Sequence, residues 1–215
     1  MKQLAILLPM IVVLLSAPVF ADDGPVQVEL ETAEVPHLQE WGDDAKALIV
    51  QWHPRIVNLL PSKGVKPPQR ITLRLRKSDD GIAGTSGTTI TVSSHWIEKH
   101  PDDLGLVLHE LVHVIQAYPS AEPGWLTEGI ADYLRWGIYE GKAQAWFPRP
   151  QAKQGYKQGY QAAAGFLLWL ESDLAPGIVK QLNSAMRRGT YSEELFKTES
   201  GHSLDELWDK YLVKE

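Results

Sequence analysis

The sequence predicts an α+β protein in which a small N-terminal sheet, antiparallel or mixed, precedes a helical C-terminal half. Two short segments between residues 69 and 94 alternate apolar and polar side chains, as half-buried strands do. From residue 102 onward, apolar side chains recur at intervals of three and four, which is the period of helices. Residues 22–215 contain no repeat and no linker-like stretch, so we expect one domain with its own core.

The first 21 residues have the composition of a secretory signal peptide. A lysine near the start is followed by an apolar run, residues 4–15, and small residues then lead to Ala21. The run is shorter than the roughly 20 residues of a membrane-spanning helix, and it includes Pro9. We therefore expect cleavage after Ala21, a secreted or periplasmic protein, and no stable membrane anchor after cleavage.

The composition limits the binding partners that we expect and the interactions that can stabilise the fold. The chain has no cysteine, so an exported form has no disulfide bonds and depends on its core and on any bound metal. Its formal net charge is −6, and it has no basic run. Nucleic acids bind concentrated Lys and Arg side chains, so nucleic acid is not an expected partner. The composition leaves the oligomeric state open.

The chain before the predicted sheet contains one long helix. Residues 22–36 alternate in part and predict a short strand or an extended arm. Residues 38–60 carry one apolar stripe at helical spacing. Pro54 lies within this stripe and should kink or split the helix.

Two strands follow. Residues 69–77 and 88–94 both alternate with a period of two. Residues 78–87, which are rich in glycine, predict a loop between them, and this suggests antiparallel pairing. The segment 88–94 is either a strand that offers its edge to an extended substrate or an internal strand.

The rest of the chain predicts helices. The first follows Pro101, where Asp102 and Asp103 can cap it and complement its dipole. Ser203 and Glu206 have the spacing of a capping box at the start of the last. The predicted helices span residues 104–118, 125–139, 156–173, 176–188, 192–196 and 203–213.

An H-E-x-x-H motif, His109-Glu110-Leu111-Val112-His113, lies in the first of these helices. Residues four apart share a helix face about 6 Å apart, so His109 and His113 can bind one Zn²⁺. Glu110 lies one position round the helix and can act as general base toward a metal-activated water. The helix is apolar on most faces, so these polar side chains need a partner such as a metal.

The next helix supplies a third ligand. Glu128 follows His113 by fifteen residues and can complete a His-His-Glu zinc site with its fourth position open. Asp132 lies one helical turn further on and can accept the second ring N–H of a ligating histidine. The remaining histidines, which we expect to be surface or capping residues, are His37, His53, His95, His100 and His202.

The motif and the segment Trp125-Leu126-Thr127-Glu128-Gly129-Ile130-Ala131-Asp132 together resemble the gluzincin clan of zinc peptidases, which includes thermolysin and aminopeptidase N. The chain is most similar to the basic secretory protein family of plants and bacteria, from about residue 38 onward. The sequences that carry this second resemblance are His109-Glu110-x-x-His113-x-x-Gln116, Glu128 to Tyr133, Gly159 to Leu167 and Leu204 to Tyr211.

The resemblance implies a zincin-like fold and a zinc-dependent peptidase acting on a peptide or protein. It assigns His109, His113 and Glu128 as ligands and Glu110 as the catalytic base. Gluzincins stabilise the oxyanion with a Tyr or His, and Tyr160 is our candidate here, with Tyr156 behind it. The chain departs from the family in being acidic, and it lacks the G-x-M-E-N motif of aminopeptidases.

Two other functions fit the sequence. One is a non-catalytic secreted binding or defence protein that retains a structural zinc site. Such sites are normally closed by four protein ligands, whereas the motifs here give three ligands and a base. The other is a zinc amidohydrolase acting on a non-protein amide, such as a cell-wall crosslink.

Overall fold

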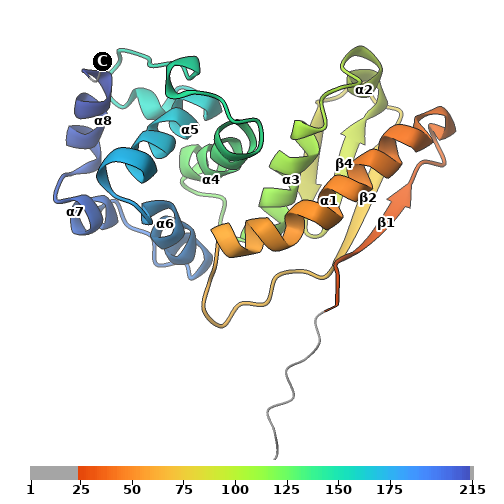
Figure 1. Ribbon diagram of the computed structural model, residues 1–215, viewed down its shortest axis with the longest axis horizontal. Helices are drawn as coiled ribbons and strands as arrows, with labels where there is room; N and C mark the ends of the chain where they lie inside the picture. Colours follow the sequence, from red (N-terminus) through yellow and green to blue (C-terminus); the bar gives the residue numbers. More distant parts are fainter. Residues whose placement is uncertain (1–23, 214–215) are drawn as a thin grey trace, which may run out of the picture.

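A small four-stranded sheet forms one side of the protein, and helices form the rest (Figure 1). The computed structural model describes residues 24–213. The predicted signal peptide, residues 1–21, lies outside the described residues. The architecture is α+β, as the sequence predicts. Within the described part of the chain, no helix has the length and apolar character needed to cross a membrane.

The sheet is mixed. Three strands run parallel to one another, and the fourth, at one edge, runs antiparallel to its neighbour. Alternate side chains of the central strands are buried, which explains the period of two in the sequence. In their order across the sheet, the strands are β1 (Gln27–Glu31), β2 (Arg70–Arg76), β4 (Thr89–Ser93) and β3 (Ala83–Ser86).

The expected antiparallel pairing of the two central strands is wrong. β2 and β4 are parallel, with Leu73 opposite Ile90. The segment 78–87, predicted as a loop, contains β3, which forms a hairpin with β4. β4 is therefore internal, and β3 is the edge strand. A tight turn cannot join two neighbouring strands that are parallel. After β2, the chain therefore forms β3 at the edge of the sheet and then turns back to form β4 between β2 and β3.

Two helices cover one face of the sheet (Figure 1). α1 (Gln39–Leu59) packs on β1 and β2, while α3 (Gly105–Gln116) packs on β3 and β4 beside it. Pro54 does not split α1, and its side chain lies on the exposed face of the helix. The sheet thus supports α3, the helix that carries the H-E-x-x-H motif.

The C-terminal half is helical, as predicted. The capping box is present, with Ser203 N–H donating to Glu206 Oε2 at 2.8 Å. The α-helix expected over residues 125–139 ends at Asp132 and continues as a π-helical segment, Tyr133–Tyr139. The other helices are α2 (Ser94–Lys99), α4 (Gly124–Asp132), α5 (Tyr160–Trp169), α6 (Ile178–Arg187), α7 (Glu194–Ser200) and α8 (Leu204–Leu212).

α4 and α5 approach each other closely at Gly129. A Cβ atom at this position would lie 2.7 Å from the Cβ of Ala163. A glycine facing an alanine therefore allows contact that a larger side chain would prevent. The close packing of α4 fixes the helix that carries Glu128 and Asp132 against the C-terminal half.

Candidate metal centre

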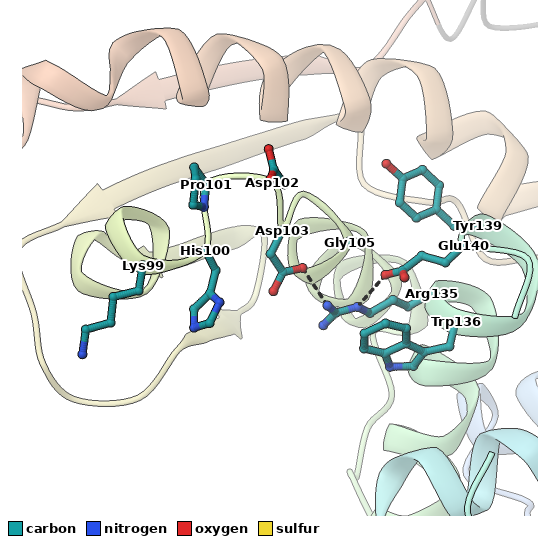
Figure 2. Close-up of a pocket in the computed structure, with 10 residues that line it drawn as sticks. All are labelled: Lys99, His100, Pro101, Asp102, Asp103, Gly105, Arg135, Trp136, Tyr139 and Glu140. Atoms are coloured by element: carbon teal, nitrogen blue, oxygen red, sulfur yellow. Dashed lines mark hydrogen bonds and ion pairs between the residues drawn. The ribbon is translucent and has the colours of Figure 1, made fainter. Parts of the chain in front are cut away.

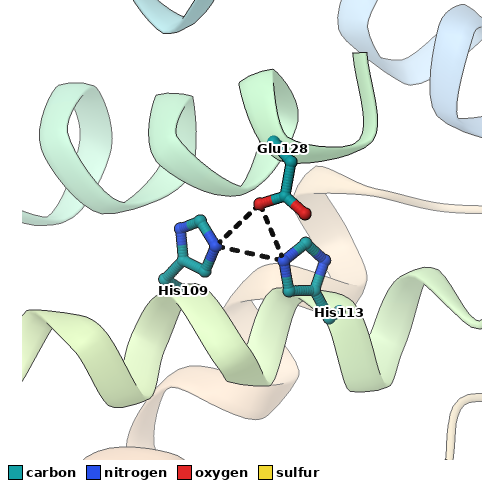
Figure 3. A group of neighbouring side chains, drawn as sticks. All are labelled: His109, His113 and Glu128. Carbon is teal, nitrogen blue, oxygen red and sulfur yellow. Dashed lines mark hydrogen bonds and ion pairs between the residues drawn. The ribbon is translucent and has the colours of Figure 1, made fainter. Parts of the chain in front are cut away.

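His109, His113 and Glu128 form a group that could hold a metal ion (Figure 3). The Nε2 atoms of the two histidines lie 3.0 Å apart, and Glu128 Oε2 lies 3.2 Å from His109 Nε2 and 3.4 Å from His113 Nε2. Ligand atoms about 2.0–2.1 Å from a tetrahedral zinc ion lie roughly 3.3 Å from one another. The three atoms thus have the separations of three corners of a zinc site.

Second hydrogen bonds orient both imidazole rings. His109 Nδ1 lies 2.8 Å from Asp132 Oδ1, as predicted for Asp132. His113 Nδ1 lies 2.7 Å from Gln116 Oε1, and an amide oxygen can only accept, so Nδ1 carries the proton. In this arrangement the Nε2 atoms face each other and a carboxylate oxygen. A metal ion bound between these three atoms would be ligated by all of them.

The electrostatics of the group also favour a cation. Burial opposes a charge on His109, but the carboxylates of Asp132 and Glu128 outweigh burial and raise the pKa of the imidazole to about 9. Burial likewise raises the pKa of Glu128, but the two histidines outweigh it and lower the pKa of the carboxyl to about 2. The site therefore keeps Glu128 ionised and attracts positive charge near neutral pH.

Gln116 connects the two helices that carry the ligands. Its side chain is 1% exposed. Its Oε1 accepts from His113, and its Nε2 donates to the backbone carbonyl of Thr127 at 3.0 Å. Thr127 immediately precedes Glu128, so one buried amide fixes the position of a ligand on α3 relative to a ligand on α4. Gln116 belongs to the family motif, but its place in the sequence alone does not indicate this role.

Both ends of α3 are held by side chains from elsewhere in the chain. At its start, Asp103 Oδ1 accepts the backbone N–H of Leu106 at 3.3 Å. At its end, the buried Arg187 on α6 donates to the backbone carbonyls of Ile115 and Gln116. These bonds satisfy carbonyl groups that a helix end leaves unpaired. The start of α3 is therefore capped by the residues that precede it, and its end is attached to α6 in the C-terminal half.

Glu110 lies beside the ligands and is held by the edge strand. The hydroxyl of Thr85 on β3 lies 2.8 Å from Glu110 Oε2 and 3.0 Å from the Glu110 backbone carbonyl. One hydroxyl proton can serve only one of these acceptors at a time. The carboxylate is buried and is not part of the ligand group. Thr85 lies in the segment predicted as a loop, so sequence reasoning missed this contact.

A cavity of about 700 Å³ opens onto the ligand group. Its walls include the three ligands, Glu110 and, from the edge strand, Ala83, Gly84 and Thr85. Tyr160, at the start of α5, also lines it and is 55% exposed. The negative charge of Glu128, more than burial, raises the pKa of the Tyr160 hydroxyl, so the hydroxyl keeps its proton near neutral pH.

Several other residues considered from the sequence lie away from this group. Tyr156 is fully buried, and its hydroxyl donates to Asp205 Oδ1 at 3.2 Å rather than lining the metal cavity. His53 is also buried, although it was expected at the surface or at a cap, and its Nε2 lies 2.7 Å from the backbone carbonyl of Pro68. Its position on the buried side of α1 explains the difference.

A second cavity, of about 820 Å³, lies where the π-helical segment meets the start of α3 (Figure 2). At its centre Arg135 bridges two carboxylates, with its Nη2 2.6 Å from Asp103 Oδ1 and its Nε 3.4 Å from Glu140 Oε1. The guanidinium carbon lies 4.0 Å from the centre of the Trp136 ring. These charges are already paired, so we place the chemistry at the His-His-Glu group despite the greater size of this cavity.

The fold and the site define an α+β protein with a His-His-Glu group that could hold a metal ion and the Glu110 carboxylate beside it. The chain belongs to the BSP family, described as a peptidase family of plants and bacteria, whose model matches residues 36–211. This is the family that the sequence motifs resemble. Searches of curated proteins and of solved structures found no match to this chain.

Proposed function

We propose that this protein is a zinc-dependent metallopeptidase of the gluzincin type. The triangle formed by His109 Nε2, His113 Nε2 and Glu128 Oε2, with edges of 3.0–3.4 Å, is the observation that carries the proposal. Membership of a family described as peptidases supports it. Two imidazoles and one carboxylate are the donor set of many catalytic zinc sites, and they leave room for a fourth ligand.

A zinc ion bound here would supply Lewis acidity, polarising the scissile carbonyl and acidifying water. Glu110 is placed to take a proton from the attacking water and to deliver it to the leaving amine nitrogen. The contact with Thr85 keeps the Glu110 carboxylate in one orientation for this work. Overall, a C–N bond is broken, the hydroxyl of water joins the carbonyl carbon, and the proton goes to the amine.

Tyr160 is our candidate for the donor that stabilises the oxyanion. It lines the same cavity as the ligands, and its raised pKa keeps the hydroxyl protonated as a donor. A donor aimed at a developing oxyanion typically contributes about 10²–10³ in kcat. The high exposure of Tyr160 in the free protein allows its side chain to turn toward a bound substrate.

The edge strand β3 offers backbone groups to an extended substrate. Ser93 N–H donates to the carbonyl of Ile82, and opposite pairs in an antiparallel ladder alternate between bonded and unbonded. The N–H and C=O of Ala83 and Thr85 therefore point away from β4, toward the cavity that they line. Strand addition at this edge replaces the earlier candidate, the internal strand β4.

We also propose that the protein acts outside the cytoplasm, either secreted or in a periplasm, because residues 1–21 read as a cleavable signal peptide. Its substrate is then a peptide or protein in that compartment. The acidic chain does not favour nucleic acid as a partner.

The first experiment compares the wild type with Glu110→Gln. Metal content is measured by elemental analysis, and cleavage is measured on a mixed peptide library with and without added zinc. Because Glu110 is not a ligand, the variant should retain zinc and the fold while kcat falls by about 10²–10⁴. Wild-type protein that binds zinc but cleaves no peptide would overturn the proposal and favour a binding protein. Hydrolysis of cell-wall amides alone would identify an amidohydrolase.

A further inference from the structure

Resting on the proposed peptidase function, we infer that the cleft accepts an internal segment of a polypeptide, so that the protein is an endopeptidase. Two properties of the described residues carry this inference. The first is that two cavities, which share four lining residues, adjoin the ligand group. The second is that no charged side chain beside the ligand group is available to bind a chain end.

Two cavities adjoin the ligand group, and a third lies beyond the smaller of them. A cavity of about 220 Å³ shares Ala83, His109, Glu110 and Tyr160 with the cavity of about 700 Å³ described above. The smaller cavity in turn shares Arg135 with the cavity of about 820 Å³. His109 and Glu110 therefore border more than one cavity. A substrate whose scissile bond lies at Glu110 has space for further residues on both sides.

The charged groups around the scissile position are already engaged. The carboxylates that line the two cavities adjoining the ligands are Glu110, Glu128 and Asp132. Thr85 holds the first, the second is a ligand, and the third is bonded to His109. Apart from Glu110, which the proposed mechanism uses as its base, the described part of the chain places no unpaired carboxylate in these cavities that could bind a terminal ammonium group.

The cationic side chain beside the site is also engaged. Arg135 lines the smaller cavity, but its guanidinium is bound to Asp103 and Glu140. No lysine lines either of the two cavities, as far as the chain is described. A terminal carboxylate next to the scissile bond would therefore lose water without gaining a counter-charge. Leaving a charge unpaired in a cleft costs binding energy, so chain ends are selected against.

The test uses two sets of peptides of the same sequences. One set is acetylated at the N-terminus and amidated at the C-terminus, and the other has free ends. Aminoacyl and carboxyl-terminal reporter substrates are assayed in parallel. We expect zinc-dependent cleavage of internal bonds in the blocked peptides, with kcat/KM about tenfold or more above that for any bond next to a free end. Mass spectrometry of the products assigns each cleaved bond.

The outcomes separate this inference from the proposed function. Zinc-dependent release of single terminal residues, with blocked peptides left intact, would overturn endo-action while leaving a peptidase in place. Cleavage of none of these substrates by zinc-loaded protein would overturn the proposed function itself. Cleavage of blocked and free peptides at the same internal bonds supports both.

Two matched variants test whether both arms of the cleft are used. Ile82→Tyr adds bulk at an exposed position in the smaller cavity, and Thr88→Tyr does so in the 700 Å³ cavity. We expect each variant to lower kcat/KM for blocked peptides several-fold and to change the set of bonds that are cut. If either variant cleaves every blocked peptide as the wild type does, that arm holds no substrate and the inference fails. Circular dichroism of both variants checks the fold.

Discussion

At the candidate metal centre, each histidine has two nitrogen atoms in different environments. In both rings Nδ1 faces an acceptor outside the ligand group, and Nε2 faces the other ligands. The acceptors differ, since Asp132 is charged and Gln116 is neutral. Against the effect of burial, the charge of Asp132 raises the pKa of His109. The two ligands are equivalent in the sequence motif but not in the folded chain.

Replacing Gln116 with Met should weaken zinc binding by about 10–100-fold, because a methionine of similar size cannot orient His113 or bind the Thr127 carbonyl. Competition with a chelator measures this without any substrate. Gln116→Glu is the matched control, since its carboxylate still accepts from His113 but does not donate to Thr127. Equal affinities in the wild type and Gln116→Met would show that Gln116 has no positioning role.

The buried His53 should make stability depend on pH. Burial lowers its pKa from 6.5, and the bond to the Pro68 carbonyl offsets this only in part. Below pH 6.5 the unfolded chain therefore binds more protons at His53 than the folded chain does. The contribution of neutral His53 to the free energy of unfolding is complete above pH 6.5 and is lost as the pH falls toward the pKa of His53 in the folded protein. Urea unfolding from neutral pH downward should show a steeper loss for the wild type than for His53→Gln. Identical slopes would contradict this assignment.

The proximity of His109, His113 and Glu128 was predictable because helical spacing places each pair of side chains on one face. His109 and His113 are four apart on one helix, and Glu128 and Asp132 are four apart on the next. Thr85 could not be predicted, because it reaches Glu110 only through the pairing of β3 with β4. A contact that depends on strand order leaves no local pattern in the sequence.

At the scale of elements, the predicted secondary structure was wrong where tertiary contacts override the intrinsic preference of the residues for a helix, strand or loop. β3 consists of Ala, Gly, Thr and Ser, a composition that is typical of a loop, and it becomes a strand because β4 lies beside it. The second motif helix was predicted with one regular period, but its C-terminal part is π-helical from Tyr133. π-Helical segments are frequent near functional sites, and Arg135 and Trp136 of this segment line the cleft.

The contact between α4 and α5 gives a prediction at this scale. Gly129→Ala should destabilise the protein by about 1–3 kcal/mol, because the new methyl group would lie 2.7 Å from the Cβ of Ala163. Chemical denaturation measures the free energy of unfolding. Gly124→Ala in the same helix is the control, since a Cβ there meets nothing within 4 Å. Equal losses in the two variants would contradict the packing argument.

For the whole molecule, the sequence predicted the class but not the order of the strands. An α+β composition follows from the two hydrophobic periods, which report local burial. The parallel pairing of β2 and β4 depends on where the chain crosses, and neither strand records this in its own residues. The zincin-like character of the fold stays a prediction from the motifs.

A metal ion bound at the ligand group would join the helix packed on the sheet to a helix of the C-terminal half, as Figure 3 shows for α3 and α4. Chelation should therefore lower the midpoint of thermal unfolding, and zinc should restore it. An ion present at about a thousand times its dissociation constant adds about 4 kcal/mol. His113→Ala should abolish the effect of zinc. A chelator that leaves the wild-type midpoint unchanged would contradict a bound ion.

The open edge of β3 also bears on how the protein avoids self-association. Unpaired backbone groups at a sheet edge can pair with another copy of the same edge and start aggregation. Here the edge strand has four residues, includes Gly84, and lies beside the cleft. A strand of this length can form only a few hydrogen bonds with the sheet of another copy. A flexible peptide that lies in the cleft would also contact the walls of the cleft. The short β3 strand thus offers little to a neighbouring sheet while it borders the cleft.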